Sequence, residues 1–407
     1  MQRVCTLAPD YSLPSQISRE LFDLQQRGLL RCPDTTDSSA GKTSVVDGRE
    51  IRVFCSNNYL DLANHPRILE AVREGLSRWG WGTAASRLIS GSTTAHVSLE
   101  QQLAQFKHTE AAVLFPTGYM ANLGLLTALA GSGDVLLIDK LCHASIIDAA
   151  RAARGTNRFF VHNDMKRLAE LLRRYSKARR ICIVTEGIFS MDGDLADLSE
   201  IVSLKNKYKA LLIVDDAHGT GVLGENGRGT AELLNVEQHI DVTVATLSKA
   251  FGSLGGFVCC SSQLARYLRN RSRSYIYTTA APAVVCLAAQ AALEIIQQEP
   301  QRRNNLQAVG KKLRDALCQA GFEIGSAQAQ IVPIILGRNE LALQFSQLLW
   351  QQGFMIPAIR EPSVPRGKAR LRISLMSCHN CRDIDELLEA LVSIAGELGV
   401  LDRSGGH

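Results

Sequence analysis

The segment from Ala210 to Gly229, ALLIVDDAHGTGVLGENGRG, decides the fold class. It begins with a short run of Leu, Ile and Val, continues with two aspartates, and ends in a stretch rich in glycine. A run that is apolar at every position is typical of a strand buried on both faces, as the strands of parallel sheets are. We therefore expect a buried strand here, followed by a long loop.

Similar apolar runs recur along the chain, separated by segments long enough for a helix. They are AAVLF at 111–115, DVLLID at 134–139, ICIVTEG at 181–187, VTVATLS at 242–248 and GGFVCC at 255–260. This alternation predicts an α/β fold with a mostly parallel central sheet covered by helices. Ligands of such folds bind at the carboxyl ends of the strands, so the residues just after each run are the functional candidates.

The flanking sequence predicts two further parts of the chain. Residues 1–54 are polar and turn-rich and read as an N-terminal arm with one short amphipathic helix at about 17–30. Residues 55–285 form the predicted large domain. Residues 286–407 form a predicted smaller α+β domain. Its expected elements are a helix at 283–298 that leads into it, the runs QIVPIIL and KARLRISL, and a helix at 383–398.

Composition excludes several classes of function. The formal net charge of +5 is small for 407 residues and the basic residues are scattered, so we expect no nucleic-acid partner. No apolar run is long enough to span a bilayer, and the first residues lack the apolar core of a signal peptide, so we expect no membrane association. Eleven irregularly spaced cysteines do not suggest a disulfide framework, which favours a reducing, cytoplasmic location.

Two short motifs have alternative interpretations. Cys378-His379-Asn380-Cys381 has the C-x-x-C form of metal sites, but no second pair completes four ligands, so we predict no metal centre. The glycines of 219–224 follow the G-x-G-x-x-G pattern of dinucleotide folds, which makes an NAD-dependent dehydrogenase the remote alternative. A dinucleotide turn must open a helix, whereas further glycines follow here, so we favour a shaped loop.

Three polar residues at strand ends suggest a specific chemistry. Asp215 and His218 follow one predicted strand, and Lys249 follows another, 34 residues after Asp215. A desolvated lysine has a lowered pKa, and its neutral amine can form a Schiff base. A buried carboxylate suits a cationic ring nitrogen. A cofactor with a pyridinium, an aldehyde and a phosphate would account for both Asp215 and Lys249. A lysine at a strand end can also simply extend to the surface.

Other strand ends carry weaker candidates. Gly118 and Tyr119 lie between a predicted strand and a predicted helix, where backbone amides could hold a phosphate. His143 follows DVLLID, and its ring could lie over a planar cofactor or be structural. Ser190 lies beyond ICIVTEG, where its hydroxyl could bind a ligand or its own turn.

Nine motifs, taken together and in order, resemble those of the α-oxoamine synthases, which are pyridoxal-phosphate enzymes of the fold-type-I aminotransferase superfamily. They are SNNYLDL, GTAASRLISGSTTAH, FPTGYMAN, HASI, TEGIFSMDGDLADL, VDDAHGTGVLGENGRG, TLSKAFGSLGG, RSYIYTTA and VPRGKARLRISL. The resemblance implies a fold-type-I aminotransferase-like structure, pyridoxal 5'-phosphate as cofactor, and a homodimer with shared active sites. It also implies an acyltransferase that condenses an amino acid with an acyl thioester and releases carbon dioxide.

The resemblance also assigns roles to residues. Lys249 would form the Schiff base, Asp215 would pair with the pyridine nitrogen, His218 would bind the ring hydroxyl, and His143 would stack on the ring and contact the substrate. The other implied cofactor contacts are Gly118, Tyr119, Ser190 and Thr246, with Thr278 and Thr279 reaching the phosphate bound by the partner subunit. The implied substrate residues are Arg31, Asn57, Ser363 and Arg372, with Arg360 as a neighbour.

The nearest family pattern implies L-alanine and a pimeloyl thioester, carried by CoA or by a carrier protein, as substrates. Sister enzymes that use glycine or serine with other acyl-CoA donors share most of the motifs and stay open as the alternative. A non-catalytic subunit on this scaffold would have lost the lysine or its aspartate, and both are present. Asp61 departs from the family pattern, which has glycine there. We expect aspartate to tolerate a positive φ at modest cost.

Overall fold

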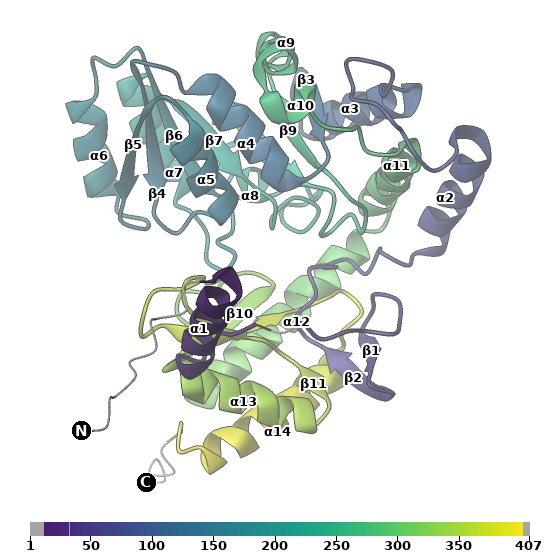
Figure 1. Ribbon diagram of the computed structural model, residues 1–407, viewed down its shortest axis with the longest axis vertical. Coiled ribbons are helices and arrows are strands. Elements are labelled where there is room, and N and C mark those ends of the chain that lie inside the picture. The colour runs from purple at the N-terminus through teal and green to yellow at the C-terminus, as the bar shows by residue number, and fades with distance from the viewer. Residues whose placement is uncertain (1–11, 32, 402–407) are drawn as a thin grey trace, which may run out of the picture.

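The computed structural model describes residues 12–31 and 33–401, and its larger part is built on one seven-stranded sheet (Figure 1). The strand order is β3-β9-β8-β7-β6-β4-β5. The strands are β3 (Ala111–Phe115), β4 (Asp134–Asp139), β5 (Thr156–Phe160), β6 (Arg180–Glu186), β7 (Leu211–Asp215), β8 (Val242–Thr246) and β9 (Gly256–Cys260). β9 alone runs opposite to the other six strands, so the expected mostly parallel α/β sheet is confirmed.

All six predicted runs form strands of this sheet, and β5 is the strand of this sheet that was not predicted; β1 (Thr43–Val46) and β2 (Arg49–Val53), in the predicted N-terminal arm, were not predicted either. The β5 sequence TNRFF has neither a continuous apolar run nor a regular alternation. It lies at the edge of the sheet and pairs only with β4, so most of its side chains stay in contact with water. An edge strand of this kind is therefore not predicted from continuous apolar runs in the sequence.

Helices cover the sheet and separate its strands in sequence. They are α2 (Pro66–Trp79), α3 (Thr94–Phe106), α4 (Gly118–Leu129), α5 (Ala144–Ala152), α6 (Met165–Arg174), α7 (Leu198–Tyr208), α8 (Thr230–Leu233), α9 (Ser262–Arg271) and α10 (Arg273–Ile276), with a 3₁₀ turn at Glu237–His239. In Figure 1, α4 and α5 lie side by side in front of the sheet. The amino end of α4 and the carboxyl ends of β6, β7 and β8 thus come together.

The smaller part of the molecule combines both ends of the chain. The helices of the smaller part are α1 (Leu13–Gln26), α12 (Pro300–Gln319), α13 (Asn339–Gln351) and α14 (Cys381–Glu397), while α11 (Ala283–Gln298) packs against α2 and α3 of the larger part (Figure 1). One sheet has the order β10-β13-β12, with β10 (Ile331–Gly337), β12 (Ala358–Ile359) and β13 (Ala369–Ser374). The other joins β1 (Thr43–Val46), β2 (Arg49–Val53) and β11 (Phe354–Met355). The N-terminal segment therefore pairs with the C-terminal one, and the division at residue 285 stays a prediction.

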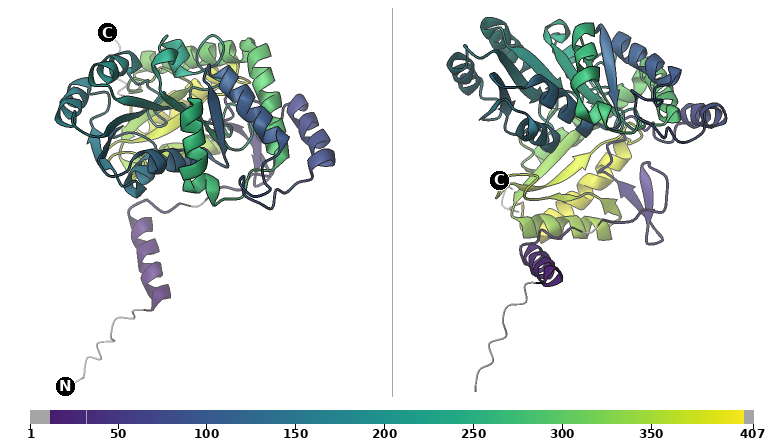
Figure 2. Two further views of the ribbon diagram at one scale, coloured as in Figure 1. Left: turned by 90° about the horizontal axis from the view of Figure 1, so that it is seen from above. Right: turned by 45° about the horizontal axis from the view of Figure 1, so that its top comes forward.

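The first helix differs from its predicted bounds. It begins four residues earlier than expected, with Pro14 in its first turn, and ends before Gly28, which has φ of 60°. All its side chains are exposed or half-buried, and Figure 2 shows it projecting from the body of the molecule. Among the described residues, no helix is both long and apolar enough to cross a membrane.

Asp216 holds the glycine-rich loop that follows β7. Its buried carboxylate accepts hydrogen bonds from the hydroxyls of Thr230, at 2.7 Å, and Thr220, at 2.8 Å, and lies 3.4 Å from the Lys107 ammonium. Gly229 has φ of 106°, and a Cβ there would lie 1.7 Å from this carboxylate. The loop thus wraps closely around Asp216 and ends only at α8, so the helix that a dinucleotide turn needs does not follow Gly224.

The C-x-x-C segment also has a structural explanation. The His379 ring stacks on Phe54, with ring centroids 4.3 Å apart, and both of its nitrogens are hydrogen-bonded to backbone groups, those of Val53 and Met376. Burial lowers the pKa of His379 to about 4, so it is neutral. Asn380 caps α14. In the described part of the chain, no group of three or more His, Cys, Asp or Glu side chains could hold a metal ion.

The buried pair of Lys107 and Asp216 leads to a stability prediction. Lys107→Met leaves the buried carboxylate without its cation, and we expect the free energy of unfolding to fall by about 3 kcal/mol. Lys311→Met is the control, since Lys311 pairs with Asp315 on the exposed surface of α12, where ion pairs contribute little. Urea unfolding of the two variants measures both effects. Equal unfolding midpoints would contradict the structural role of Lys107.

Candidate functional site

A cavity of about 210 Å³ lies at the carboxyl ends of the central strands. Its lining residues are Thr117, Gly118, Tyr119, Asn122, His143, Ser145, Glu186, Asp215, Ala217, His218, Val244, Ala245, Thr246, Ser248 and Lys249. The cavity is several times larger than the ~30 Å³ that a water molecule takes up in the liquid. It brings together all the predicted catalytic residues and every predicted cofactor residue except Ser190, Thr278 and Thr279.

Asp215 is the buried anion of the cavity. One carboxylate oxygen accepts a hydrogen bond from the Asn122 amide at 2.7 Å, and the other accepts from the backbone N–H of Ala217 at 3.0 Å. The loop after β7 and the facing helix α4 therefore fix the orientation of this carboxylate. The arrangement can stabilise a cationic group inside the cavity.

Glu186 was missed by the sequence reasoning. It is the last residue of β6 and lies beside Asp215 in the strand register, fully buried. Burial and the charge of Asp215 raise the pKa of Glu186 well above its ordinary value, which favours the neutral form of the Glu186 side chain. Its side chain accepts a hydrogen bond from the backbone N–H of His143. Its place at a strand end, in the motif TEGIFSMDGD, was the available signal.

Lys249 is the cationic or nucleophilic group of the cavity. It lies in the turn after β8, where its Nζ is 2.7 Å from Nε2 of His218. Burial lowers the pKa of Lys249 to about 8, against the opposing effect of the Asp215 and Glu186 carboxyls. Burial and the Lys249 charge also lower the pKa of His218 well below its ordinary value. A neutral imidazole therefore lies beside an amine that is partly neutral near pH 8.

The other end of the cavity offers groups for an anion. Thr117 caps α4 by accepting a hydrogen bond from the backbone N–H of Met120 at 3.1 Å, and Gly118 and Tyr119 form the first turn of the helix. Backbone N–H groups in a first turn have no partner within their own helix, and the helix dipole favours an anion there. The hydroxyl of Thr246 faces this turn, since a Cβ on Gly118 would lie 3.6 Å from its Oγ1.

His143 lies at the N-cap of α5, on the exposed side of the cavity. Its Nδ1 is 2.8 Å from the Ser145 hydroxyl and accepts a hydrogen bond from the Ser145 backbone N–H. The backbone N–H of His143 also donates a hydrogen bond to the Glu186 side chain, and together these contacts restrain the position of His143. A restrained, exposed ring at this edge is suited to lying over a planar molecule.

Arg372 links two predicted residues that lie just outside the cavity lining. Its Nε donates to the Ser190 carbonyl at 2.6 Å, and its Nη2 lies 3.5 Å from Oδ1 of Asn57. Arg372 is 7% exposed, yet it forms no ion pair within residues 12–31 and 33–401. Its charge contributes to the lowered pKa of Lys249. A buried guanidinium near the cavity therefore lacks an anion, which a ligand can supply.

The remaining predicted substrate residues form a separate group. Arg31 donates to the Glu361 carbonyl at 3.2 Å, and Arg360 donates to the Gly28 carbonyl. Ser363 follows on the same loop and is exposed. Burial and the nearby Arg31 charge lower the pKa of Arg360, which places the two guanidiniums close to each other. This group does not line the cavity that contains Lys249.

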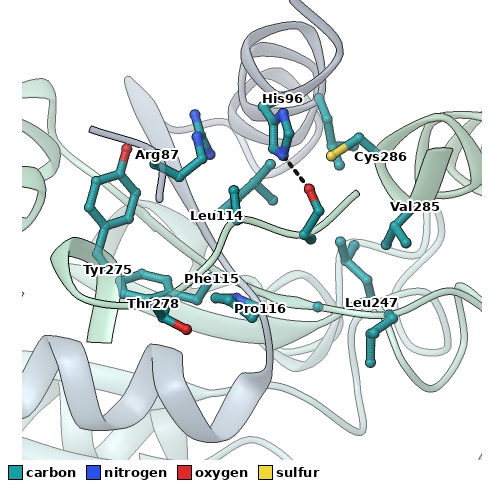
Figure 3. Close-up of a pocket in the computed structure, with 15 residues that line it drawn as sticks. Arg87, His96, Leu114, Phe115, Pro116, Leu247, Tyr275, Thr278, Val285 and Cys286 are labelled. Atoms are coloured by element: carbon teal, nitrogen blue, oxygen red, sulfur yellow. Dashed lines mark hydrogen bonds between the residues drawn. The ribbon is translucent and has the colours of Figure 1, made fainter. Parts of the chain in front are cut away.

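The structure places Thr278 and Thr279 away from the Lys249 cavity of their own chain. Thr279 pairs with Ser86, and Thr278 lines a different cavity of only about 20 Å³ (Figure 3). The two basic side chains there are already bonded, since His96 pairs with the Ala281 carbonyl at 2.8 Å and Arg87 with Glu100. This second cavity is therefore a packing gap rather than a site.

Asp61 adopts the conformation expected from the sequence. Its φ is 55°, in the left-handed region that favours glycine. Its backbone N–H donates to the Asn58 carbonyl at 2.8 Å, and its side chain lies 3.4 Å from the Asn58 amide. Aspartate is among the residues that tolerate this region, so the turn next to Asn57 forms despite the substitution.

The donor set of the cavity fits pyridoxal phosphate. Asp215 provides a buried anion for a cationic ring nitrogen, and Lys249 provides an amine for an aldehyde carbon. The first turn of α4, which the Thr246 side chain faces, provides backbone N–H donors for a phosphate. These three kinds of group line one cavity.

Comparison of the sequence with known proteins identifies the family. Residues 49–391 match the family aminotransferase class I and II. The chain is 45% identical to the 8-amino-7-oxononanoate synthase of Geobacter sulfurreducens over 95% of this chain and 99% of that protein. It is 43% identical to the enzyme of the same name from Methylococcus capsulatus, over 91% of this chain and 96% of that protein.

Solved structures that resemble this chain also include enzymes of this family, at lower sequence identity. Serine palmitoyltransferase from S. paucimobilis, with a bound PLP-myriocin aldimine, superposes with a TM-score of 0.91 and 30% identity, covering 96% of this chain and 100% of that one. The 8-amino-7-oxononanoate synthase of Francisella tularensis superposes with a TM-score of 0.74 and 29% identity, covering 85% and 98%.

The lowered pKa of Lys249 can be measured by its reactivity. In the protein without cofactor, we expect modification of Lys249 by trinitrobenzenesulfonate to accelerate with a midpoint near pH 8, because only the neutral amine reacts. Peptide mass spectrometry across a pH series follows this one residue. A midpoint near the ordinary value of 10.5 would contradict the desolvated environment.

Proposed function

Because the chain belongs to the aminotransferase class I and II family, and within it to the α-oxoamine synthases, we propose that it forms 8-amino-7-oxononanoate in biotin biosynthesis. The reaction is the decarboxylative condensation of L-alanine with a pimeloyl thioester, and pyridoxal phosphate is the cofactor. The structural observation that carries the proposal is the buried Arg372 guanidinium beside the Lys249 cavity, which has no carboxylate partner.

When bound, pyridoxal phosphate withdraws electrons from Cα of the amino acid and so stabilises a carbanion there. Asp215 would hold the ring nitrogen in its protonated form, since a buried carboxylate favours a cation beside it. The first turn of α4 and Thr246 would hold the phosphate, and His143 would cover the ring. Lys249 would hold the aldehyde carbon between turnovers.

Lys249 is the proposed base. With its pKa lowered to about 8, it can accept a proton from Cα near neutral pH and return it later to the product. Its Nζ lies 2.7 Å from a neutral His218, so no cationic neighbour stands in contact with it on that side. The same residue can therefore take up and release the proton without a second group.

Arg372 is the proposed ligand of the amino-acid carboxylate. Its Nε and Nη1 bond to the Ser190 carbonyl and the Ser374 hydroxyl, which fixes the plane of the guanidinium. A fixed guanidinium suits planar recognition of a carboxylate. The side chain of Asn57, which lies between Arg372 and Tyr59, would contact the same end of the substrate.

Arg31 and Arg360 suit an acyl chain that ends in a carboxylate. The two like charges lie close together, and each side chain is bonded to a backbone carbonyl rather than to a carboxylate. An anion would offset their repulsion. Ser363, on the adjoining loop, belongs to the same proposed substrate region. This favours a pimeloyl donor over the fully apolar acyl chain of the sister enzymes that use serine.

The proposed reaction is tested by thiol release from acyl thioesters. L-alanine, glycine and L-serine are each combined with pimeloyl-CoA, pimeloyl-carrier protein, acetyl-CoA and palmitoyl-CoA. We expect the highest kcat/KM with L-alanine and a pimeloyl donor, and no activity in Lys249→Ala. Absence of thiol release from this pair, with release from glycine or serine and another donor, would favour a sister activity.

A matched variant tests the role of Arg372. Arg372→Lys keeps the charge but loses the planar pair of donors, and we expect the KM for L-alanine to rise about 30-fold, which corresponds to ~2 kcal/mol. The KM for the acyl donor should change little. Equal effects on both KM values would show that Arg372 does not bind the amino acid selectively.

A homodimer with shared sites is the proposed assembly. Ile89 is 82% exposed and Tyr277 72%, and Leu88 lies beside Ile89. The pairing of Ser86 with Thr279 brings these apolar side chains to one surface. An exposed apolar surface of this kind is typical of a protein interface. Contact with a second copy would carry Thr278 and Thr279 toward the phosphate site of the partner.

Mixed dimers test the shared site. A Lys249→Ala chain and a chain with both Thr278→Ala and Thr279→Ala are co-expressed and assayed at limiting pyridoxal phosphate. If the threonines act across the interface, each mixed dimer contains one intact site, and we expect recovery of about a quarter of the wild-type activity from random pairing. If the threonines act within their own chain, no intact site forms and activity does not recover.

We also infer a cytoplasmic location for this reaction. Nine cysteines of the described chain are free, and most of these thiols are buried. Free thiols persist in a reducing compartment.

A further inference from the structure

We propose that His162 is a positioning residue for Arg372, the proposed ligand of the amino-acid carboxylate. His162 follows β5 and does not line the cavity that contains Lys249. It acts through the loop between β6 and α7, residues 187–197, whose Ser190 carbonyl accepts a hydrogen bond from the Arg372 guanidinium. This inference rests on the proposed role of Arg372 and concerns how its guanidinium is held in place.

The ring of His162 joins two buried carboxylates from different segments. Its Nδ1 lies 3.0 Å from Asp139, the last residue of β4, and its Nε2 lies 2.7 Å from Asp194 in the β6–α7 loop. The ring also packs edge-on against Phe189, with ring centroids 4.2 Å apart. Phe189 directly precedes Ser190, and its backbone N–H donates to the Asp194 carbonyl at 3.0 Å. The ring therefore restrains both sides of the turn that carries Ser190.

The direction of the two hydrogen bonds follows from the partners of the ring. Both ring nitrogens face carboxylates, which can only accept. Burial opposes a charge on His162, but the hydrogen bonds to Asp139 and Asp194 outweigh this effect and raise the pKa of His162 to about 10. The ring is therefore an imidazolium near neutral pH, and it donates from both nitrogens.

Asp194 depends on this ring more than Asp139 does. Asp139 also accepts hydrogen bonds from the backbone N–H groups of Leu141 and Asn163, at 2.9 and 3.2 Å. Within residues 12–31 and 33–401, the buried Oδ1 of Asp194 has no hydrogen-bond partner, and its Oδ2 has a further contact only with the Ser326 hydroxyl at 3.4 Å. Loss of the ring would leave this buried carboxylate, and with it the loop, without a strong donor.

The loop is connected to the substrate region through the Ser190 carbonyl. Nε of Arg372 donates to this carbonyl at 2.6 Å, which is shorter than the 2.8 Å contact of Nη1 with the Ser374 hydroxyl. A shift of the carbonyl would turn the guanidinium, and recognition of a planar carboxylate by paired N–H groups requires a fixed plane. Displacement of the loop should therefore weaken binding of the substrate carboxylate more than binding of the substrate amine.

Paired ligands test this role without turnover. L-Alanine and ethylamine, which lacks only the carboxylate, are titrated into the protein loaded with pyridoxal phosphate, and the absorbance of the bound cofactor gives each Kd. In His162→Gln we expect the ratio of the Kd of L-alanine to that of ethylamine to rise about tenfold, because the carboxylate is bound less well. An unchanged ratio would overturn the proposal, since a general loss of structure weakens both ligands alike.

Further variants supply the control and a second test of the loop contact. His239→Gln alters a half-buried histidine before the amino end of β8, at the opposite edge of the sheet from the cavity, and should leave the ratio unchanged. Asp194→Ala should raise the ratio as His162→Gln does, whereas Asp194→Asn keeps an acceptor for the ring and should raise it less. A wild-type ratio in Asp194→Ala would contradict the proposal, even if His162→Gln does not fold.

The charge of the ring provides a readout that is independent of any ligand. In protein with ¹⁵N-labelled histidine, His162→Gln identifies the His162 resonances in a long-range ¹H–¹⁵N correlation. We expect both ring nitrogens to be protonated near pH 8, well below the pKa of about 10. A ring with one unprotonated nitrogen would overturn the proposal, because it could donate to only one of the two segments.

The outcome is separate from that of the proposed reaction. Glycine with methylamine and L-serine with ethanolamine give the same comparison for the sister activities, so the test does not depend on which amino acid or acyl donor the enzyme uses. Arg372→Lys should raise the same ratio. If it does so and His162→Gln does not, Arg372 binds the carboxylate but His162 does not position it.

Discussion

Two consecutive buried carboxylates, Asp215 and Asp216, lie at the end of strand β7 and organise both the glycine-rich loop and the cavity. Their side chains contact different parts of the structure. Asp216 binds Lys107, Thr220 and Thr230, and so fixes the glycine-rich loop. Asp215 faces the cavity. Because both carboxylates are buried, each needs its own partners, and the loop that satisfies the first also positions the second and His218.

The chemistry of the cavity depends on a small number of charged side chains. Burial and the charge of Asp215 raise the pKa of Glu186 well above its ordinary value, which favours the neutral form of this side chain. The desolvation that lowers the pKa of Lys249 to about 8 is partly offset by the Asp215 and Glu186 carboxyl groups, and this balance sets the pH range in which the amine can act as a base. Arg372 adds a buried positive charge nearby, which we propose binds the carboxylate of the amino-acid substrate.

Much of the fold could be read from the chain because its buried strands are apolar at every position. β4, β6, β7 and β8 were found in this way, and the placement of Asp215 and Lys249 directly after two of them led to the site. The edge strand β5 could not be found because it is neither continuously apolar nor alternating. Glu186 was missed because its position beside Asp215 depends on the pairing of strands that are distant in sequence.

The class of the sheet, the family and the candidate residues at the strand ends could be read from the amino-acid sequence, because burial and strand periodicity are local properties of the chain. That Glu186 is buried beside Asp215, that Tyr59 reaches His218, and that Thr278 and Thr279 lie away from the cavity of their own chain became visible only in the folded protein. These are properties of desolvation and distance between segments, and no spacing within a single segment encodes them.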